Sequence, residues 1–398
     1  MLPLITDAVV AVVAAVLAIP CGVFWLECIV AIFARRLPAK SPADHPQPKA
    51  VILVPAHDEE VVIAETLAGL KQQLGPADRI LVVADNCSDG TVDLVKAAGV
   101  EVIERHDTER RGKGYAIVYG LDHLAADPPD IVTIVDADCT AEAGALELIA
   151  REASFTGRPV QAEYLLTSPD DSPKTVVSAL AFLVRNRVRP RGLARVGLPA
   201  HLTGSGMAFP WDVLRNAPAT GSYLVEDLLM GIELALKGTP PLLCAEAQIT
   251  SLLPTRDRAA MGQRRRWEHG QLMTLTRYAP RLVWAGVTRY DFGLFALGMD
   301  LFVPPLALLV LACVGVLTLS VVPLVLFGRW WSFVVAADNL FTVATGVGVA
   351  WLFYGRSTIR LSQLIAVPLY VLWKIPLYLS LLLRGGQKTW ERTERTSK

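Results

Sequence analysis

The chain has 398 residues with 38 basic and 38 acidic side chains, so its net charge indicates neither a polyanionic nor a polycationic partner. Apolar residues make up 53% of the sequence and the mean hydropathy is +0.41, which is high for a soluble enzyme. The six cysteines are scattered without a Cys-x-x-Cys pair, which argues against a structural zinc site and suits a reducing compartment. The sequence carries no nucleic-acid-binding motif, and no nucleic-acid partner is expected.

The first apolar segment lies at the N-terminus. Residues 8–34 hold one acidic residue, Glu27, and no basic residue, which is long enough for a membrane span. A cleaved signal peptide is the alternative, but the apolar run is too long for one and no basic region precedes it. The basic residues Arg35, Arg36, Lys40 and Lys49 follow, which places the next segment in the cytoplasm by the positive-inside rule.

The middle of the chain alternates between two apolar patterns. Strand-like runs cover residues 50–54, 79–84, 101–103, 131–135 and 160–166. Helical patterns cover residues 59–74, 91–98, 113–125 and 142–155. This alternation predicts an α/β fold, a mainly parallel sheet with flanking helices, whose ligands bind beyond the carboxyl ends of the strands.

Acidic residues follow three of these strands, namely Asp58 and Glu59, Asp85 and Asp89, and Asp136 and Asp138. Each pair could cap or stabilise the start of the next helix, and Asp89 before Gly90-Thr91 has the position of such a cap. Three acidic clusters at one sheet edge would repel each other unless a cation and a ligand lay between them. Asp136 and Asp138 alternate on an extended segment, so their carboxylates share a side and predict a Mg²⁺ or Mn²⁺ site for a diphosphate.

Two further motifs lie closer to the C-terminus. Glu226-Asp227 opens a predicted helix, where an acid stabilises the helix dipole or, alternatively, acts as a general base toward an acceptor hydroxyl. Residues 256–289 hold eight arginines and two acids, which predicts a membrane-surface helix. On that helix Gln263, Arg266 and Trp267 share a face, while Arg264 and Arg265 point elsewhere, and guanidinium groups of this kind can hold phosphate.

A second basic run contains five arginines and no acid, at positions 185, 187, 189, 191 and 195. One interpretation is a solvated or lipid-facing surface. The other is a cradle for a phosphorylated lipid acceptor.

The C-terminal part is apolar again. Residues 290–383 hold only seven charges, and hydrophobic blocks cover 292–327, 331–353 and 361–383. Three spans would leave the basic tail outside, against the positive-inside rule. Either the first block makes two short passes around Pro304-Pro305, or one block is re-entrant, and the last block is the more irregular in sequence.

Seven motifs point to a family. They are VPAHDEE (54–60), VVADNCSDGT (82–91), RGKGYA (111–116), VDAD (135–138), GSGMAF (204–209), VEDLLMG (225–231) and QRRRW (263–267). Their set and order resemble the membrane-bound family 2 glycosyltransferases, the group of cellulose, chitin and hyaluronan synthases and ceramide glucosyltransferase. Two departures are visible: Asp58 stands where the family usually has Asn, and Asp85-Asn86 where it usually has Asp-Asp.

The resemblance implies a GT-A fold and a nucleotide-sugar donor, with UDP as the expected nucleotide. It implies donor contacts from Pro55, Glu59, Asp85, Lys113 and Asp136, and Mg²⁺ or Mn²⁺ held by Asp136 and Asp138. It implies that Asp227, with Glu226 beside it, is the catalytic base. It implies acceptor or diphosphate contacts from Gly204, Ser205, Gly206, Gln263, Arg266 and Trp267.

The predicted organisation is an N-terminal transmembrane helix (1–36), a cytoplasmic GT-A domain (45–255), interfacial amphipathic helices (256–290), a C-terminal transmembrane region of about three helices (291–384) and a basic tail (385–398). The expected function is inverting sugar transfer at the cytoplasmic (inner) membrane, to a lipid-linked or membrane-embedded acceptor, in surface polysaccharide or glycolipid synthesis. The alternatives are a nucleotidyltransferase, which would release pyrophosphate, and an inactive scaffold of a polysaccharide export complex. The short C-terminal bundle favours single transfer over polymer extrusion.

Overall fold

The computed structural model describes residues 2–33, 46–168, 170, 172–218, 225–253 and 257–384. The chain forms two compact units. The helical unit comprises Met1–Arg35, Asp170–Val196 and Gln271–Gly386, and the sheet unit comprises the rest of the chain. The insertion of residues 170–196 into the helical unit differs from the predicted continuous domain over 45–255.

Among the described residues, the sheet unit contains one eight-stranded sheet in the order β3-β2-β1-β4-β7-β6-β8-β5. The strands are β1 (Ala50–Ala56), β2 (Arg79–Asp85), β3 (Glu101–Arg105), β4 (Ile131–Ile134), β5 (Cys139–Ala141), β6 (Val160–Thr167), β7 (Met207–Pro210) and β8 (Leu242–Leu252). Strands β3, β2, β1 and β4 are parallel, and β6 is parallel to β8. β7 runs antiparallel to β4 and β6, and β5 antiparallel to β8.

The helices of the sheet unit are α2 (Ile63–Lys71), α3 (Thr91–Ala97), α4 (Lys113–Leu124), α5 (Ala145–Thr156), α8 (Trp211–Arg215), α9 (Glu226–Leu236) and the first part of α10 (Asp257–Thr288). β1, β2 and β4 are almost wholly buried, which explains their unbroken Val, Ile and Leu runs. Side chains of α4 and α9, among them Leu121 and Leu234, pack with Leu53 and Leu81 of the sheet in one core.

The predicted α/β sheet with flanking helices is confirmed, and its five predicted strands are β1, β2, β3, β4 and β6. Strands β5, β7 and β8 were not predicted from the sequence. β5 and β7 have three and four residues, too few for a visible alternation, and β8 carries Glu246 and Gln248 beside a bulge in its pairing with β6.

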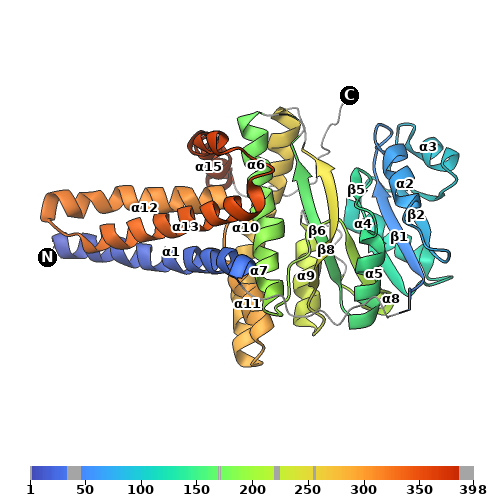
Figure 1. Ribbon diagram of the computed structural model, residues 1–398, viewed down its shortest axis with the longest axis horizontal. Helices are drawn as coiled ribbons and strands as arrows, with labels where there is room; N and C mark the ends of the chain where they lie inside the picture. Colours follow the sequence, from blue (N-terminus) through green and yellow to red (C-terminus); the bar gives the residue numbers. More distant parts are fainter. Residues whose placement is uncertain are drawn as a thin grey trace. The chain divides into compact units, whose positions relative to one another are not determined.

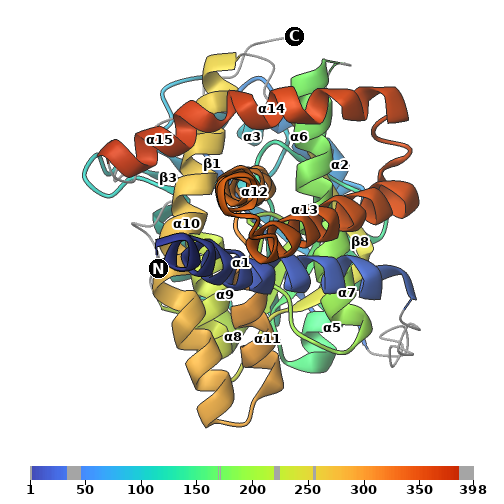
Figure 2. The same cartoon turned by 90° about the vertical axis from the view of Figure 1, so that its left-hand side faces the viewer.

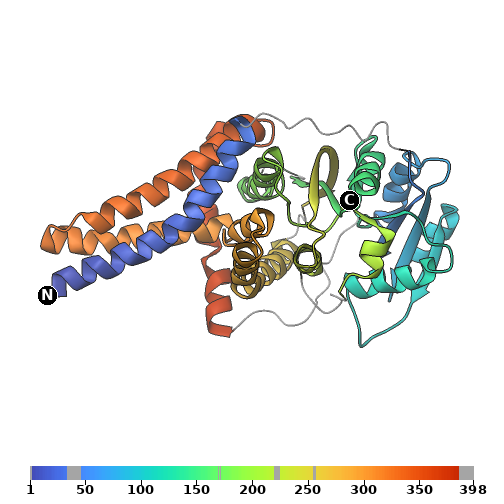
Figure 3. The same cartoon turned by 90° about the horizontal axis from the view of Figure 1, so that it is seen from below.

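The helical unit contains α1 (Leu2–Phe33), α6 (Pro173–Leu183), the π-helix η2 (Val184–Val188), α7 (Arg189–Arg195), the rest of α10, α11 (Phe292–Leu301), α12 (Leu306–Phe327), α13 (Trp331–Ala350) with the π-helical turn η3 (Trp351–Gly355), the 3₁₀ helix η4 (Leu361–Ala366), α14 (Val367–Trp373) and α15 (Ile375–Arg384). α1, α12 and α13 lie side by side (Figures 1 and 3). Phe24, Cys28, Leu309 and Cys313 are among the residues of their buried core. Asn339 donates a hydrogen bond to the Ala14 carbonyl at 2.8 Å.

Four helical segments of the described residues are long and apolar enough to cross a membrane: Leu4–Ile32, Leu306–Phe327, Trp331–Gly355 and Leu361–Ser380. The sequence predicts one N-terminal and about three C-terminal helices of this kind, and the number and positions of the long apolar segments agree with that prediction. The block 292–327 divides at Pro304-Pro305 into α11 and α12, and the ten residues of α11 are too few for a span.

The arginines in the middle of the second basic run (185–195) face neither solvent or lipid, nor a site for a phosphorylated lipid, which were the two interpretations of the sequence. The side chain of Arg189 is 7% exposed; its Nε donates to Glu27 of α1 at 2.6 Å and its Nη2 to Asp300 of α11 at 2.6 Å. Arg195 donates to the Ile32 carbonyl at 3.0 Å, and Arg191 lies over the Tyr354 ring. These arginines attach α7 to the apolar helices, which a sequence pattern without acids nearby could not reveal.

Replacing Arg189 by Leu should destabilise the helical unit by about 3–5 kcal/mol, because two carboxylates would lose their buried counter-charge. Thermal unfolding of the purified protein in detergent would measure this. Arg329→Leu is the matched control, because Arg329 is exposed between α12 and α13. Equal unfolding temperatures for the two variants would contradict a structural role for Arg189.

Candidate functional site

Three segments of the sheet unit meet where β4 ends. β4 pairs with β7 through Ile134 and Met207, which brings the loop before β7 beside Asp136. The backbone N–H of Asp136 donates to Ser205 Oγ at 3.1 Å. Lys113, the first residue of α4, forms an ion pair with Asp136 and donates to the Gly204 carbonyl at 2.6 Å. The carboxyl end of β4, the start of α4 and the loop 203–206 therefore share one site.

The first turn of α9 adds Glu226 and Asp227 to this site. Gly204 has φ +104°, and a Cβ there would lie 3.2 Å from Asp227 Oδ2, so the absence of a side chain lets the carboxylate face the loop backbone. Burial and the neighbouring Asp227 raise the pKa of Glu226 to about 7. Burial alone would lower the pKa of Lys113, but Asp136 and then Glu226 hold it above its ordinary value.

Asp136 and Asp138 fit a divalent cation. Their carboxylate oxygens and the Cys139 sulfur lie within 4.8 Å of one another. Burial, opposed by Lys113 and supported by Asp138, raises the pKa of Asp136, as expected for acids gathered without enough positive charge. Burial first, and then Asp138, raises the pKa of Cys139 well above its ordinary value. Oxygen ligands from carboxylates suit Mg²⁺ or Mn²⁺.

Asp138 is held by a residue that the sequence analysis did not identify. Ser251 of β8 donates to Asp138 Oδ2 at 2.7 Å, and β5 pairs with β8 through Cys139 and Ser251. Gln161 of β6 plays a similar part for the loop: its side chain donates to the Ser205 carbonyl and accepts from the Thr203 N–H, both at 2.8 Å. Ser251 lies on β8, which was not predicted from the sequence. Gln161 lies on β6, which was predicted, but its neighbouring strands in the sheet were not.

The acids after β1 and β2 make hydrogen bonds between their own two loops. Asp58, at φ +52°, accepts the Ser88 N–H at 2.6 Å, a bond for which either a carboxylate or an amide oxygen serves. Asp89 accepts the Thr91 N–H at 3.0 Å, but the N-cap of α3 is Gly90, so Asp89 lies one residue before the cap position that was predicted for it. Asp58, Cys87 and Asp89 also lie close enough for a metal, but hydrogen bonds to the two loops already engage both carboxylates.

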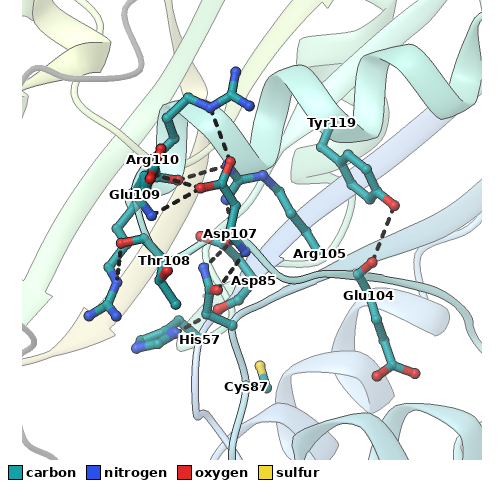
Figure 4. Close-up of polar contacts among 12 residues, drawn as sticks. His57, Asp85, Cys87, Glu104, Arg105, Asp107, Thr108, Glu109, Arg110 and Tyr119 are labelled. Atoms are coloured by element: carbon teal, nitrogen blue, oxygen red, sulfur yellow. Dashed lines mark hydrogen bonds and ion pairs between the residues drawn. The ribbon is translucent and has the colours of Figure 1, made fainter.

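Asp85 lies at the centre of a network between the ends of β2 and β3 (Figure 4). Its Oδ1 accepts from Arg105 Nη1 at 2.6 Å and from Asn86 Nδ2 at 2.9 Å, and Arg105 also binds Asp107 at 3.0 Å. Asn86, at φ +53°, accepts the Asp107 N–H at 2.8 Å. An Asp at position 86 could not donate to Asp85, which explains why Asn suits this chain.

The other predicted donor residues lie near Asp85. Pro55 pairs with Val83 within the parallel strands β1 and β2, and the Glu59 N–H donates to Thr91 Oγ1 at 2.8 Å. His57 Nδ1 lies 2.6 Å from the Asp85 carbonyl oxygen. Pro55, Glu59 and Asp85 thus lie at the ends of β1 and β2, whereas Lys113 and Asp136 lie where α4 begins and β4 ends.

Within the loop 204–206, Gly204 is the residue beside Asp227. Ser205 is fully buried, and its hydroxyl accepts from the Asp136 backbone instead of facing an acceptor. Gly206 is buried against Ile249 and Ala162. In the structure Ser205 and Gly206 contact Asp136, Ile249 and Ala162 of the sheet unit. The sequence had instead predicted that these two residues contact the acceptor or the diphosphate.

The QRRRW motif lies on α10, as predicted for Gln263, Arg266 and Trp267, although the side chain of Gln263 is outside the described residues. α10 approaches the start of α9 closely, since a Cβ on Gly270 would lie 2.7 Å from Val225, the residue before Glu226. Arg266 and Trp267 are half-buried and Arg265 is exposed. Arg264 is only 8% exposed, so Arg265 is the better candidate for a surface anchor.

Comparison with known proteins agrees with this geometry. The family model described as "Glycosyltransferase like family 2" matches residues 46–270, more than half of the chain. A probable glycosyltransferase YdaM of Bacillus subtilis is 36% identical over 118 residues, and the 4,4'-diaponeurosporenoate glycosyltransferase of Staphylococcus aureus is 31% identical over 119 residues. These matches cover 28% and 29% of this chain but only 27% and 31% of the relatives' own lengths.

A solved structure is similar over nearly the whole chain. The mannosyltransferase PcManGT from Pyrobaculum calidifontis, in complex with GDP-Man and Mn²⁺, matches with a TM-score of 0.57 and 16% identity. The match covers 95% of this chain and 99% of that one. At this identity the similarity concerns the fold.

Proposed function

Because the chain belongs to the glycosyltransferase like family 2 and its sheet is of the GT-A type, we propose that it transfers a sugar from a nucleoside-diphosphate sugar to a membrane-embedded or lipid-linked acceptor. The observation that carries the proposal is the meeting of Lys113, Asp136 and Asp227 around the Gly204 backbone. A base, a cation and a metal-binding carboxylate are the groups that such a transfer needs around the anomeric carbon.

In the proposed reaction Asp227 takes the proton of the acceptor hydroxyl, and the acceptor oxygen bonds to the anomeric carbon. The bond from that carbon to the diphosphate oxygen breaks, and the nucleoside diphosphate leaves from the opposite side, so the configuration inverts. Lys113 and Arg266 oppose the charge on the departing diphosphate. Trp267 stacks on the sugar or the acceptor.

Asp136 and Asp138 would hold the divalent cation. Ser205 accepts a hydrogen bond from the Asp136 backbone and Ser251 donates one to the Asp138 carboxylate, so the two serines position the two aspartates. A bound Mg²⁺ or Mn²⁺ would neutralise charge on the diphosphate oxygens. The Mn²⁺ in the similar mannosyltransferase supports Mn²⁺ as the first ion to test.

The membrane location of the acceptor rests on the apolar helices. Four segments are long and apolar enough to cross a bilayer, and the basic residues after α1 favour a cytoplasmic sheet unit. We therefore place the chain in the cytoplasmic membrane, where it would serve surface polysaccharide or glycolipid synthesis.

The donor can be identified by incubating membranes that contain the chain with UDP-, GDP- and dTDP-sugars and Mn²⁺. Release of one nucleoside diphosphate above that of membranes lacking the chain is the expected result. Formation of a nucleoside triphosphate and a sugar 1-phosphate when pyrophosphate is added would instead favour a nucleotidyltransferase.

Arg266→Lys should lower transfer at least tenfold, because a point charge cannot reproduce the planar guanidinium fork. Trp267→Ala should also lower transfer at least tenfold, because the ring that stacks on the sugar or the acceptor is lost. Neither substitution should change membrane insertion. Arg265→Lys is the matched control and should keep the wild-type rate, since Arg265 is exposed. Initial transfer rates and membrane yield would be measured together. Equal rates for the Arg265 and Arg266 variants would show that the run serves only as an anchor.

A further inference from the structure

The last apolar segment, formed by η4, α14 and α15, differs in direction from the other candidate spans. α14 and α15 run across the direction of α12, as both Figure 1 and Figure 2 show. We propose that residues 361–384 lie along the membrane surface, with exposed aliphatic side chains among the lipid acyl chains, and do not form a fourth span. The proposal depends on the membrane location but not on sugar transfer.

The segment begins at a defined end of the helical unit. Tyr354 donates to the Ala31 carbonyl at 2.7 Å, so α13 and its continuation η3 finish near the end of α1 that carries Phe33. At the opposite end Ala14 packs with Val316 and Ala336. If α1, α12 and α13 are the spans, residue 361 starts on the same side of the bilayer as Phe33.

One face of the segment is exposed and aliphatic. Leu361, Ile365, Leu369, Leu372 and Leu379 are 65%, 80%, 70%, 56% and 49% exposed. The opposite face is buried: Tyr370 is 5% exposed, and its hydroxyl lies 3.0 Å from Ser178 Oγ of α6. A one-sided apolar stripe on a helix that packs on its other side is typical of a membrane-surface helix.

The backbone of the segment is poorly suited to a span. Its first six residues are 3₁₀ helix, and the α-helix stops at Trp373 and restarts at Ile375. Lys374 lies at that break, buried, with its Nζ 5.0 Å from the Tyr370 ring centroid. A cation and a helix break inside a span are both unfavourable.

The flanking charges suit an anionic lipid surface. Arg356 and Arg360 precede the segment and are exposed. In the sequence, residues 384–398 contain five basic and two acidic residues. A surface segment keeps this basic tail on the side of Phe33, in agreement with the positive-inside rule, whereas a span would carry it across.

Spin labels can separate the two arrangements. Ile365→Cys and Leu372→Cys would be labelled separately in a Cys87→Ser background and reconstituted into vesicles with anionic lipid. Oxygen and nickel-chelate accessibilities then give the depth of each label. Val334 and Phe341 of α13 are the matched control pair, since they are exposed and also seven residues apart.

The two α13 labels should differ in depth by about 10 Å, the rise of seven helical residues. Positions 365 and 372 should have nearly equal, shallow depths. A depth difference at 365 and 372 as large as that of the control pair would overturn the proposal. Dipolar broadening that disappears on dilution with unlabelled chain would also overturn it, because a second copy would then cover the stripe.

Sidedness gives an independent test. A protease-cleavable tag after Lys398 and another after Arg329, in sealed vesicles, should be cleaved from opposite sides of the membrane. Cleavage from the same side would show that residues 361–384 cross it. Neither experiment measures sugar transfer, so a failure here leaves the proposed activity to be judged separately.

Discussion

Replacing Asp227 by Asn should lower turnover by roughly 10²–10⁴, the usual contribution of a general base, while donor affinity changes little. Asn keeps the size of the side chain that faces Gly204, so the loop should stay in place. It cannot, however, take the proton of the acceptor hydroxyl. Transfer rate and nucleotide-sugar binding, measured on the same preparation, test the two parts of this expectation.

Glu226→Gln is the matched variant, one residue away on the same helical turn, and should cost less. A base at Glu226, with its pKa near 7, would instead give a rate that falls as the pH drops below about 7, because the protonated acid cannot accept a proton. Near wild-type transfer by Asp227→Asn would assign the base elsewhere. Loss of donor binding in that variant would make Asp227 a structural or metal-linked residue.

Asp138→Asn should abolish turnover even in excess Mn²⁺, since an amide lacks the charge that holds a hard cation. Mn²⁺ affinity, followed by the paramagnetic resonance of the free ion, should fall with it. Chelation of the wild-type protein should likewise abolish turnover. Full activity in EDTA would contradict a metal-dependent mechanism.

Ser251→Ala should weaken Mn²⁺ binding by about 10–100-fold, because Ser251 orients the Asp138 carboxylate. Thr250→Ala is its control, since successive side chains on β8 point to opposite faces. Equal Mn²⁺ affinities for these two variants would show that Ser251 does not position the metal ligand.

The parts of the site that lie close in sequence were predictable, and those joined by distant strands were not. Asp136, Asp138, Glu226 and Asp227 could be identified because a buried strand or a helix start precedes or includes them. Ser251 could not, because its role depends on β8 pairing with β5, a register that no local pattern encodes.

The same limit explains the basic residues. The residues next to Arg189 in sequence are typical of a surface charge. Glu27 and Asp300 lie beside it only because α7 packs against α1 and α11. Arg105 was likewise missed, because the pairing of β2 with β3 brings it to Asp85. Apolar periodicity predicts elements well, whereas ion pairs between distant elements follow from tertiary packing.

The most direct test of the central proposal is the product analysis of one reaction, with purified chain in lipid, Mn²⁺ and a donor labelled in its sugar. The amount of nucleoside diphosphate released should equal the amount of labelled sugar in the lipid-extractable fraction. The anomeric configuration of that sugar should be inverted. Nucleoside triphosphate formed on addition of pyrophosphate, retained configuration, or sugar released only to water would contradict this proposal.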